Sequence, residues 1–213
     1  MDKRYAIFDM DGTLVDSMGY WQSLEREFLI QKGVTEGLDE ILERTKPMTL
    51  EEASNLFIET FHMEGTAEEL ADEIHGIMEG HYRQDVCTKP GAKEYLDRLQ
   101  ERGVKMCVAS ATPAPLIRLC LERLGLLKYF DFILSCVDVG AGKSRPDVYL
   151  ECARRLDAQP GEIAVFEDAV YAVRSSKAAG FYVVGIKDDC NTGFWEEICS
   201  TSHEIITDWT KAN

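Results

Sequence analysis

The chain begins with a short apolar run that leads directly into two carboxylates. Residues Tyr5–Phe8 read YAIF and are followed by Asp9 and Asp11, and then by Gly12 and Thr13. An apolar run of this kind is typical of a buried strand in a parallel sheet. Side chains two residues apart on an extended chain point to the same side, so Asp9 and Asp11 can face one reacting group. We therefore expect a strand that ends at a reactive edge of a sheet.

The residue types in this segment indicate a particular chemistry. Two carboxylates so close together stay ionised only beside a cation, unless they share a proton. One carboxylate as nucleophile and one as acid/base is a pairing that phosphate-ester chemistry can use. Gly12 permits a tight exit from the strand, and Thr13 offers a hydroxyl and a backbone N–H to an anion.

Beyond residue 91 the pattern alternates between helix and strand. Such alternation predicts βαβ units and a parallel sheet that is covered on both faces. The predicted strands are residues 104–109, 132–136, 163–166 and 182–186, with a short last strand at 205–206. The predicted helices are residues 92–102, a segment ending near 124, a segment that Pro146 opens, and residues 170–179.

Residues 18–85 show only helical periodicity. Thr49 and Thr66 each stand three residues before a glutamate, as in a capping box at the start of a helix. We therefore predict an α/β fold, a Rossmann-like parallel sheet with helices on both faces, plus an inserted all-α cap. The predicted core domain is residues 1–16 and 88–213, and the predicted helical cap domain is residues 17–87.

Further polar residues follow the other predicted strands. Ser110 and then Thr112 follow the strand 104–109, and Lys143 lies in a glycine-containing loop after the strand 132–136. Glu167 and Asp168 follow the strand 163–166. In open α/β sheets, ligands bind at the carboxyl ends of the strands. We therefore expect these side chains to gather beside Asp9 and Asp11.

Four segments resemble, in the same order, the motifs of the haloacid dehalogenase-like hydrolases, a superfamily made up mostly of phosphatases. The similarity is greatest to the helical-cap subgroup of phosphatases and β-phosphoglucomutase-like proteins. Three positions depart from the usual pattern: Ser144 replaces a proline, and Ala169 and Ala172 replace a serine and a glycine. The four segments are 8–17 (FDMDGTLVDS), 108–112 (VASAT), 142–147 (GKSRPD) and 165–168 (VFED).

The resemblance implies a role for each of these residues. It implies that Asp9 is the nucleophile, that Asp11 is the general acid/base, and that Lys143 offsets the charge of the nucleophile. The implied phosphate ligands are Ser110, Lys143 and main-chain N–H groups at Gly12 and Ala111. The implied Mg²⁺ ligands are Asp9, Asp168, the main-chain oxygen of Asp11, and Glu167 in or near the shell.

The implied function is a Mg²⁺-dependent phosphatase that hydrolyses a small phosphorylated metabolite, such as a sugar phosphate, through an aspartyl-phosphate. The alternative is a β-phosphoglucomutase-like phosphomutase. Those enzymes carry a histidine twelve residues after the nucleophile, where this chain has Trp21, and their cap arginine has no clear match in residues 45–53. A non-catalytic phosphate-binding regulatory protein is a third reading. The segments near Trp21 and Lys46 are expected to select the leaving group.

Composition narrows the partners and the compartment. The net charge of −15 argues against a nucleic-acid partner or an anionic membrane surface. Residues 1–4 lead straight into the first strand, so we expect no signal peptide, and no run of eighteen apolar residues occurs. The seven cysteines include no Cys-x-x-Cys pair, which fits a reducing cytoplasm. The four histidines form no metal-ligand pattern and are expected to be solvated. Oligomeric state is left open.

Overall fold

The computed structural model describes residues 2–45, 48 and 50–212 of the chain. The chain forms two compact units: Met1–Met18 with Val86–Asn213, called here the larger unit, and Gly19–Asp85, the smaller unit. Thr49, which we predicted as a helix cap, and Lys46, which we assigned to substrate selection, lie outside the described residues. Within the described part of the chain, every helix is too short or too polar to cross a lipid bilayer.

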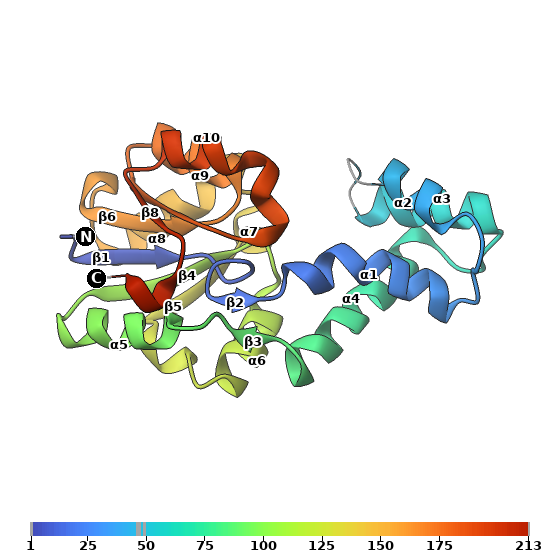
Figure 1. The fold of residues 1–213 in the computed structure, drawn as a ribbon, viewed down its shortest axis with the longest axis horizontal. Helices are drawn as coiled ribbons and strands as arrows, with labels where there is room; N and C mark the ends of the chain where they lie inside the picture. The colour runs from blue at the N-terminus through green and yellow to red at the C-terminus, as the bar shows by residue number, and fades with distance from the viewer. Residues whose placement is uncertain (1, 46–47, 49, 213) are drawn as a thin grey trace. The chain divides into compact units, whose positions relative to one another are not determined.

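The larger unit contains a six-stranded parallel sheet with the strand order β5-β4-β1-β6-β7-β8 (Figure 1). This sheet and its helices confirm the predicted Rossmann-like α/β fold. Residue Cys136 was wrongly predicted to end a strand: it begins the short helix α7, Cys136–Val139, because Ser135 and Asp138 form a capping box there. The strands are β1 Tyr5–Phe8, β4 Lys105–Ser110, β5 Phe132–Ser135, β6 Ile163–Glu167, β7 Tyr182–Ile186 and β8 Glu204–Ile206.

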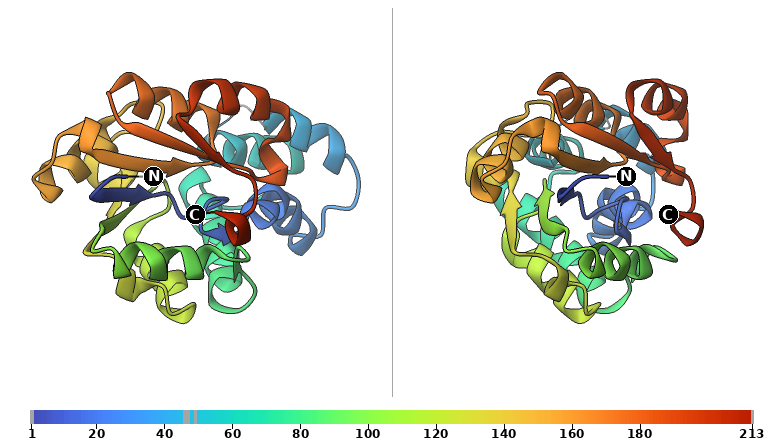
Figure 2. Two further views of the ribbon diagram at one scale, coloured as in Figure 1. Left: turned by 60° about the vertical axis from the view of Figure 1, so that its left-hand side comes forward. Right: turned by 90° about the vertical axis from the view of Figure 1, so that its left-hand side faces the viewer.

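Strand β1 lies in the middle of this sheet, although it is far in sequence from the other five strands of the sheet. Tyr5 pairs with Lys105 of β4 on one side and with Ile163 of β6 on the other. Ile7 and Phe8 are fully buried, because helices cover both faces of the sheet (Figure 2). The carboxyl ends of β4, β1 and β6 therefore lie next to one another.

Alternation along the strands separates two apolar layers. Ile7 and Val165 pack on one face in a cluster that includes Cys152 of helix α8. On the other face Phe8 stacks on Phe166, with ring centroids 4.2 Å apart, beside Tyr95 and Trp209. The helices of the larger unit include α5 Ala92–Glu101, α6 Ala114–Arg123, α8 Asp147–Leu156, α9 Val170–Ala178 and α10 Trp195–Thr201, and the short 3-10 helices include η3 Asp189–Phe194 and η4 Trp209–Lys211.

A second, antiparallel sheet of two short strands marks the points where the chain leaves and re-enters the larger unit. Strand β2, Val15–Asp16, pairs with β3, Cys87–Thr88. This pair was not predicted, since two residues are too few to show a periodicity. Immediately after β3, the backbone N–H of Lys89 donates to the carbonyl of Leu14 at 2.9 Å.

The smaller unit is helical over its described residues, and its assignment as a cap domain stays a prediction. Thr66 and Glu69 form the predicted capping box at the start of α4. The expectation that all histidines are solvated is wrong for His81, because its ring bonds to Asp85 at 2.8 Å and to Glu27 at 2.9 Å. The helices are α1 Met18–Gln31, α2 Leu38–Thr45, α3 Leu50–Phe61 and α4 Ala67–Gln84.

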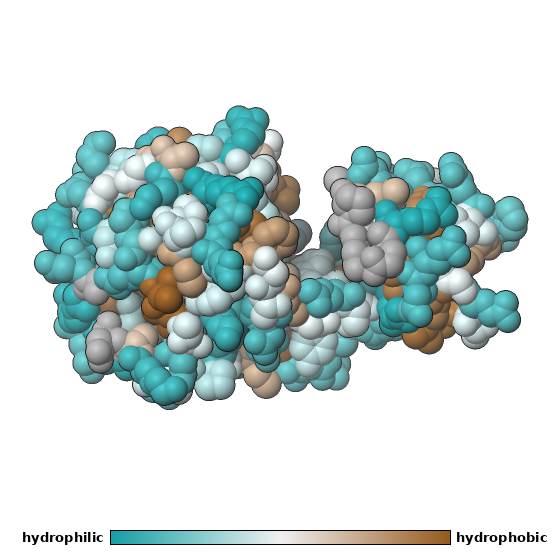
Figure 3. Space-filling model, turned by 45° about the horizontal axis from the view of Figure 1, so that its top comes forward, coloured by the Kyte–Doolittle hydropathy of each residue, from teal (hydrophilic) through white to brown (hydrophobic). Residues whose placement is uncertain are grey.

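The surface is mostly hydrophilic on the face shown in Figure 3, where apolar residues form small, separate patches. Leu150, which lies on the apolar stripe predicted for the helix after Pro146, is 44% exposed. Its neighbours on that helix, Tyr149 and Cys152, are fully buried and carry the packing against the sheet.

Candidate active site

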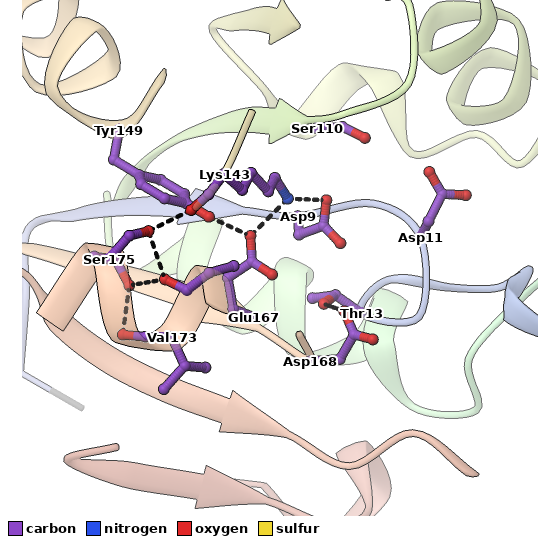
Figure 4. Close-up of polar contacts among 12 residues, drawn as sticks. Asp9, Asp11, Thr13, Ser110, Lys143, Tyr149, Glu167, Asp168, Val173 and Ser175 are labelled. Carbon is purple, nitrogen blue, oxygen red and sulfur yellow. Dashed lines mark hydrogen bonds and ion pairs between the residues drawn. The ribbon is translucent and has the colours of Figure 1, made fainter. Parts of the chain in front are cut away.

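The ammonium group of Lys143 lies between two carboxylates at the carboxyl edge of the sheet. Lys143 donates to Asp9 and, at 2.6 Å, to Glu167, and all three side chains are buried (Figure 4). Lys143 comes from the loop between α7 and α8, Asp9 follows β1, and Glu167 ends β6. The backbone N–H of Asp9 donates to the carbonyl of Phe166 at 3.0 Å, which continues the pairing of the two strands.

Strand alternation explains why these side chains lie on the same side of the sheet. Asp9 lies two residues after Ile7, and Glu167 lies two residues after Val165. Side chains two residues apart on a strand point to the same face, and Ile7 and Val165 face α8. On that side Tyr149, from the first turn of α8, donates its hydroxyl to Oε1 of Glu167 at 2.7 Å. The site therefore combines the edge of the sheet with the start of a helix.

The main chain of Lys143 is also held. The hydroxyl of Ser175, in α9, donates to the carbonyl of Lys143, and it lies 3.2 Å from the carbonyl of Ala172 in its own helix. Ser175 is thus a direct link between α9 and the loop that carries Lys143.

Asp9, Glu167 and Asp168 form a buried acidic cluster in which one carboxylate oxygen from each lies within 4.8 Å of the others. Burial raises the pKa of Asp9 well above its usual range, an effect that Lys143 opposes and Glu167 reinforces. Burial and the charge of Glu167 likewise raise the pKa of Asp168 to about 7. When all three carboxylates are ionised, the single ammonium group of Lys143 balances only part of their negative charge.

This cluster fits a hard divalent cation. Among the buried side-chain oxygens of the described residues, Oε2 of Glu167 has no hydrogen-bond partner. A buried carboxylate oxygen without a partner is costly unless a cation or a donor satisfies it. An all-oxygen set of carboxylates is the donor set that Mg²⁺ prefers. Asp9, Glu167 and Asp168 could therefore hold such an ion.

Lys143 is suited to binding an anion. Burial alone would lower the pKa of its ammonium group, but the charges of Asp9 and Glu167 outweigh burial and raise the pKa above the usual value for lysine. The side chain thus carries a full positive charge at neutral pH, directly beside the carboxylate of Asp9.

Asp168 is fixed from two sides. Thr13 donates its hydroxyl to Oδ1 of Asp168 at 3.2 Å, and the side-chain amide of Asn191 donates to Oδ2 at 2.5 Å. Gly12 has a φ of 75°, and a Cβ placed there would lie 2.5 Å from Oδ2 of Asp168. Glycine is therefore required at position 12 both by the backbone conformation and by the close approach of this carboxylate.

Asp11 has a different set of partners from Asp9. Its Oδ1 accepts a hydrogen bond from Ser17 at 2.7 Å, and its Oδ2 accepts one from Thr112 at 2.8 Å. Ser110, at the end of β4, is buried, and its hydroxyl oxygen accepts from the backbone N–H of Thr112 at 3.1 Å. Ala111, between them, is exposed. The loop after β4 thus links Ser110 to Asp11.

Sequence reasoning missed three residues that contact this set: Tyr149, Ser175 and Asn191. Tyr149 lies on the apolar stripe of α8 and has the pattern of a core residue. Ser175 lies within α9, and Asn191 lies in the 3-10 helix after β7. None of them belongs to a local pattern that signals a site, because the partner of each is distant in sequence and is brought near by the fold.

Comparison with known proteins identifies the family. A model of the haloacid dehalogenase-like hydrolases matches residues 3–180. A phosphorylated carbohydrates phosphatase of Thermotoga maritima is 28% identical over 191 residues, covering 88% of this chain and 87% of that protein. The fructose-1-phosphate phosphatase of Escherichia coli is 29% identical over 189 residues, covering 88% of this chain and 99% of that enzyme.

The structural comparison agrees with this. The crystal structure of a Thermotoga maritima protein provisionally described as a beta-phosphoglucomutase superimposes with a TM-score of 0.80 at 26% identity. The match covers 97% of this chain and 95% of that one. The family match spans most of the chain, and the motifs that it includes lie together at one edge of the sheet. The chain therefore belongs to the haloacid dehalogenase-like hydrolases and is an enzyme of that family.

Proposed function

We propose that the protein is a Mg²⁺-dependent phosphatase that hydrolyses a small phosphomonoester, either a sugar phosphate or a similar metabolite. The observation that carries this proposal is Lys143 held between Asp9 and Glu167, with Asp168 in the same cluster. This arrangement offers a nucleophile, a cation for the phosphate, and carboxylates for a metal ion. The relative from Thermotoga maritima, a phosphatase of phosphorylated carbohydrates, supports the substrate class.

In this proposal Asp9, Asp168, the main-chain oxygen of Asp11 and Glu167 hold Mg²⁺. When bound, the ion would neutralise the repulsion between the carboxylate of Asp9 and an anionic phosphate. The unpartnered Oε2 of Glu167 supports this assignment.

The chain's own residues then divide the reaction between them. Asp9 attacks phosphorus in line, the ester bond breaks, and an aspartyl-phosphate forms. Asp11 gives a proton to the leaving oxygen and later takes one from the water that hydrolyses the aspartyl-phosphate. Lys143, Ser110 and main-chain N–H groups at Gly12 and Ala111 stabilise the phosphate oxygens. Ser17 and Thr112 orient Asp11 for both proton transfers.

A phosphomutase is the second candidate, because the structurally similar protein is described as a beta-phosphoglucomutase. Position 21 argues against it. Trp21 donates its indole N–H to the hydroxyl of Tyr82 at 3.2 Å, within the smaller unit. An indole is only a donor and does not exchange protons near neutral pH, so it cannot replace an imidazole. We prefer the phosphatase for this reason.

We place the protein in a reducing compartment, the cytoplasm. All seven cysteines lie in the described part of the chain, and all are free. Cys107, Cys120 and Cys152 are fully buried in the larger unit, where they pack as small apolar side chains. Free buried thiols fit a cell compartment in which disulfides do not persist.

The test is phosphate release from a panel of small phosphomonoesters that includes both anomers of glucose 1-phosphate. We expect release with Mg²⁺ from a narrow subset, and none with EDTA. The Asp9→Asn variant is the control, since it keeps the size of the side chain and removes the nucleophile. Conversion of a sugar 1-phosphate to its 6-phosphate without release of phosphate would favour the mutase. Full activity of Asp9→Asn would refute the proposed nucleophile.

A further inference from the structure

The loop after β7 is anchored by a partly buried ion pair that lies outside the four motifs. Asp188 is only 5% exposed, and its Oδ1 accepts from the backbone N–H of Cys190 at 2.9 Å at the start of η3. Its Oδ2 accepts from the ammonium of Lys89 at 2.7 Å, and the same ammonium donates to the carbonyl of Lys187 at 3.2 Å. Lys89 thus fixes both the side chain and the main chain of this loop.

The loop in turn reaches the acidic cluster. The backbone N–H of Asn191 donates to the carbonyl of Asp188 at 3.2 Å, and its side-chain amide donates to Oδ2 of Asp168 at 2.5 Å. A continuous path of hydrogen bonds therefore runs from Lys89 through Asp188 and Asn191 to Asp168. Every link in it lies within the larger unit.

The position of Lys89 gives this path a particular meaning. Lys89 directly follows β3, where the chain returns to the larger unit after the helical insertion, and its backbone N–H bonds to Leu14 beside β2. The segment by which the chain leaves the larger unit and the segment by which it returns are therefore linked by the hydrogen bond from Lys89 to Leu14. The same residue holds the loop that contacts Asp168.

We propose that Asn191 is a positioning residue that orients Asp168 for metal binding, and that the Lys89–Asp188 pair holds Asn191 in place. The proposal rests on the proposed function, in which Asp168 is a metal ligand. Without the amide of Asn191, the described side chains leave Asp168 with only the longer hydrogen bond from Thr13, at 3.2 Å. The carboxylate would then rotate more freely. Fixing it in one orientation would cost free energy when the metal binds, so metal affinity would fall.

The expected size of the effect follows from the chemistry of metal sites. Ligating carboxylates are themselves hydrogen-bonded, and loss of such a partner typically weakens metal binding by about 10- to 100-fold. Asn191 is half-buried at the surface of the loop, so Asn191→Ala removes the amide without opening a cavity in the core. Lys89→Met removes the charge that pairs with Asp188 and keeps much of the side-chain length.

The test is Mn²⁺ binding, measured by electron paramagnetic resonance from the signal of the free ion, in the absence of substrate. Mn²⁺ accepts the same carboxylate oxygens as Mg²⁺. We expect Asn191→Ala to raise the Kd by about tenfold or more. Thr192→Ala, at the neighbouring exposed position, should bind Mn²⁺ as the wild type does. At saturating Mg²⁺, kcat of Asn191→Ala should return to within about twofold of the wild type, as expected when only metal affinity has changed.

A double-mutant cycle tests the rest of the path. If Lys89 acts through Asn191, the double variant Lys89→Met/Asn191→Ala binds Mn²⁺ no more weakly than Asn191→Ala alone. Additive losses would overturn the proposed path from Lys89. If circular dichroism shows Lys89→Met to be unfolded, Asp188→Asn takes its place in the cycle, because asparagine also caps a helix start.

The outcomes separate this inference from the proposed function. Wild-type Kd values in Asn191→Ala, together with clear Mn²⁺ binding by the wild type, would refute the role of Asn191 alone. Failure of the wild type to bind Mn²⁺, or full binding by Asp168→Asn, would refute the metal site itself, and the inference with it.

Discussion

Tyr149 donates its hydroxyl to Oε1 of Glu167, an oxygen that also accepts from Lys143. Burial raises the pKa of Tyr149 well above its usual range, and the charge of Glu167 raises it further. The phenol therefore stays a neutral donor at neutral pH. Because both donors use Oε1, the other oxygen of Glu167 is left without a hydrogen-bond partner among the described residues.

Replacing Tyr149 by phenylalanine should show what the hydrogen bond to Glu167 contributes. The change removes one buried hydrogen bond to a charged group, so we expect the free energy of unfolding to fall by about 1–3 kcal/mol. We also expect kcat/KM to fall, since Glu167 loses a fixed orientation. Urea unfolding and steady-state kinetics measure the two effects. Tyr182→Phe is the matched control, because Tyr182 also donates to a glutamate, Glu204, at 2.7 Å, away from the acidic cluster. Equal losses of activity in both variants would contradict the assignment.

Asp11→Asn should slow the reaction in both halves. The variant keeps the shape that Ser17 and Thr112 surround, but it can neither protonate the leaving oxygen nor activate water. General acid/base groups typically contribute about 10²- to 10⁴-fold, so we expect kcat to fall within that range. Rapid quenching with radiolabelled substrate should trap phosphorylated protein at Asp9. Unchanged steady-state turnover would exclude Asp11 from proton transfer.

Two adjacent serines of α9 provide a matched pair. Ser175 and Ser176 are both buried and both bond to a carbonyl of their own helix, but only Ser175 reaches the carbonyl of Lys143. We expect Ser175→Ala to speed hydrogen exchange in residues 140–146 and to raise KM, because the loop that presents Lys143 is released. Ser176→Ala should change neither. Exchange measured by mass spectrometry, together with KM and kcat, decides between a local tether and a general packing effect.

The pH dependence of stability should reveal the ion pairs of His81. Burial lowers the pKa of His81, but the hydrogen bonds to Asp85 and Glu27 outweigh burial, and the net pKa lies above 6.5. A raised folded-state pKa adds stability below about pH 6.5 that is lost as the pH rises through that pKa. His81→Gln should therefore lower the Tm more at about pH 5.5 than at about pH 8.5.

His75 supplies a control of opposite sign. Burial lowers the pKa of His75, so protonation opposes folding and stability falls as the pH drops below 6.5. His75→Gln should remove that loss, so at about pH 5.5 the Tm of the variant should rise relative to that of the wild type. Thermal melts of both variants at the two pH values test the pair. The same direction of change in both would contradict the assigned ion pairs.

The sequence predicted the parallel sheet and placed the strand ends to within one residue, because both depend on local patterns. Apolar runs identify strands that are buried on both faces, and polar residues directly after them must lie at the carboxyl edge. Asp9, Ser110 and Glu167 are placed in this way. Their catalytic and metal-binding roles stay predictions, since the geometry alone does not test a reaction.

The residues that cover Glu167 and Asp168 could not be predicted, because no local pattern marks them. Glu167 and Asp168 are adjacent and would point to opposite sides of an extended strand, yet both are buried. Glu167 is covered by α8 through Tyr149, and Asp168 is covered by Thr13 and Asn191. Each of these partners arrives through tertiary packing. The pairing of Lys89 with Asp188 has the same origin.

The central position of β1 has a consequence for biosynthesis. Strand β1 leaves the ribosome well before its partners β4 and β6, whose residues come much later in the chain. The strand that leads to Asp9 therefore has no partner until translation has passed β4, and it lacks its second partner until translation has passed Glu167. Such long-range pairing slows folding and leaves a hydrophobic strand exposed in the nascent chain. The helical insertion depends on local contacts, so its helices can form before the strand that leads to Asp9 has paired with β4 and β6.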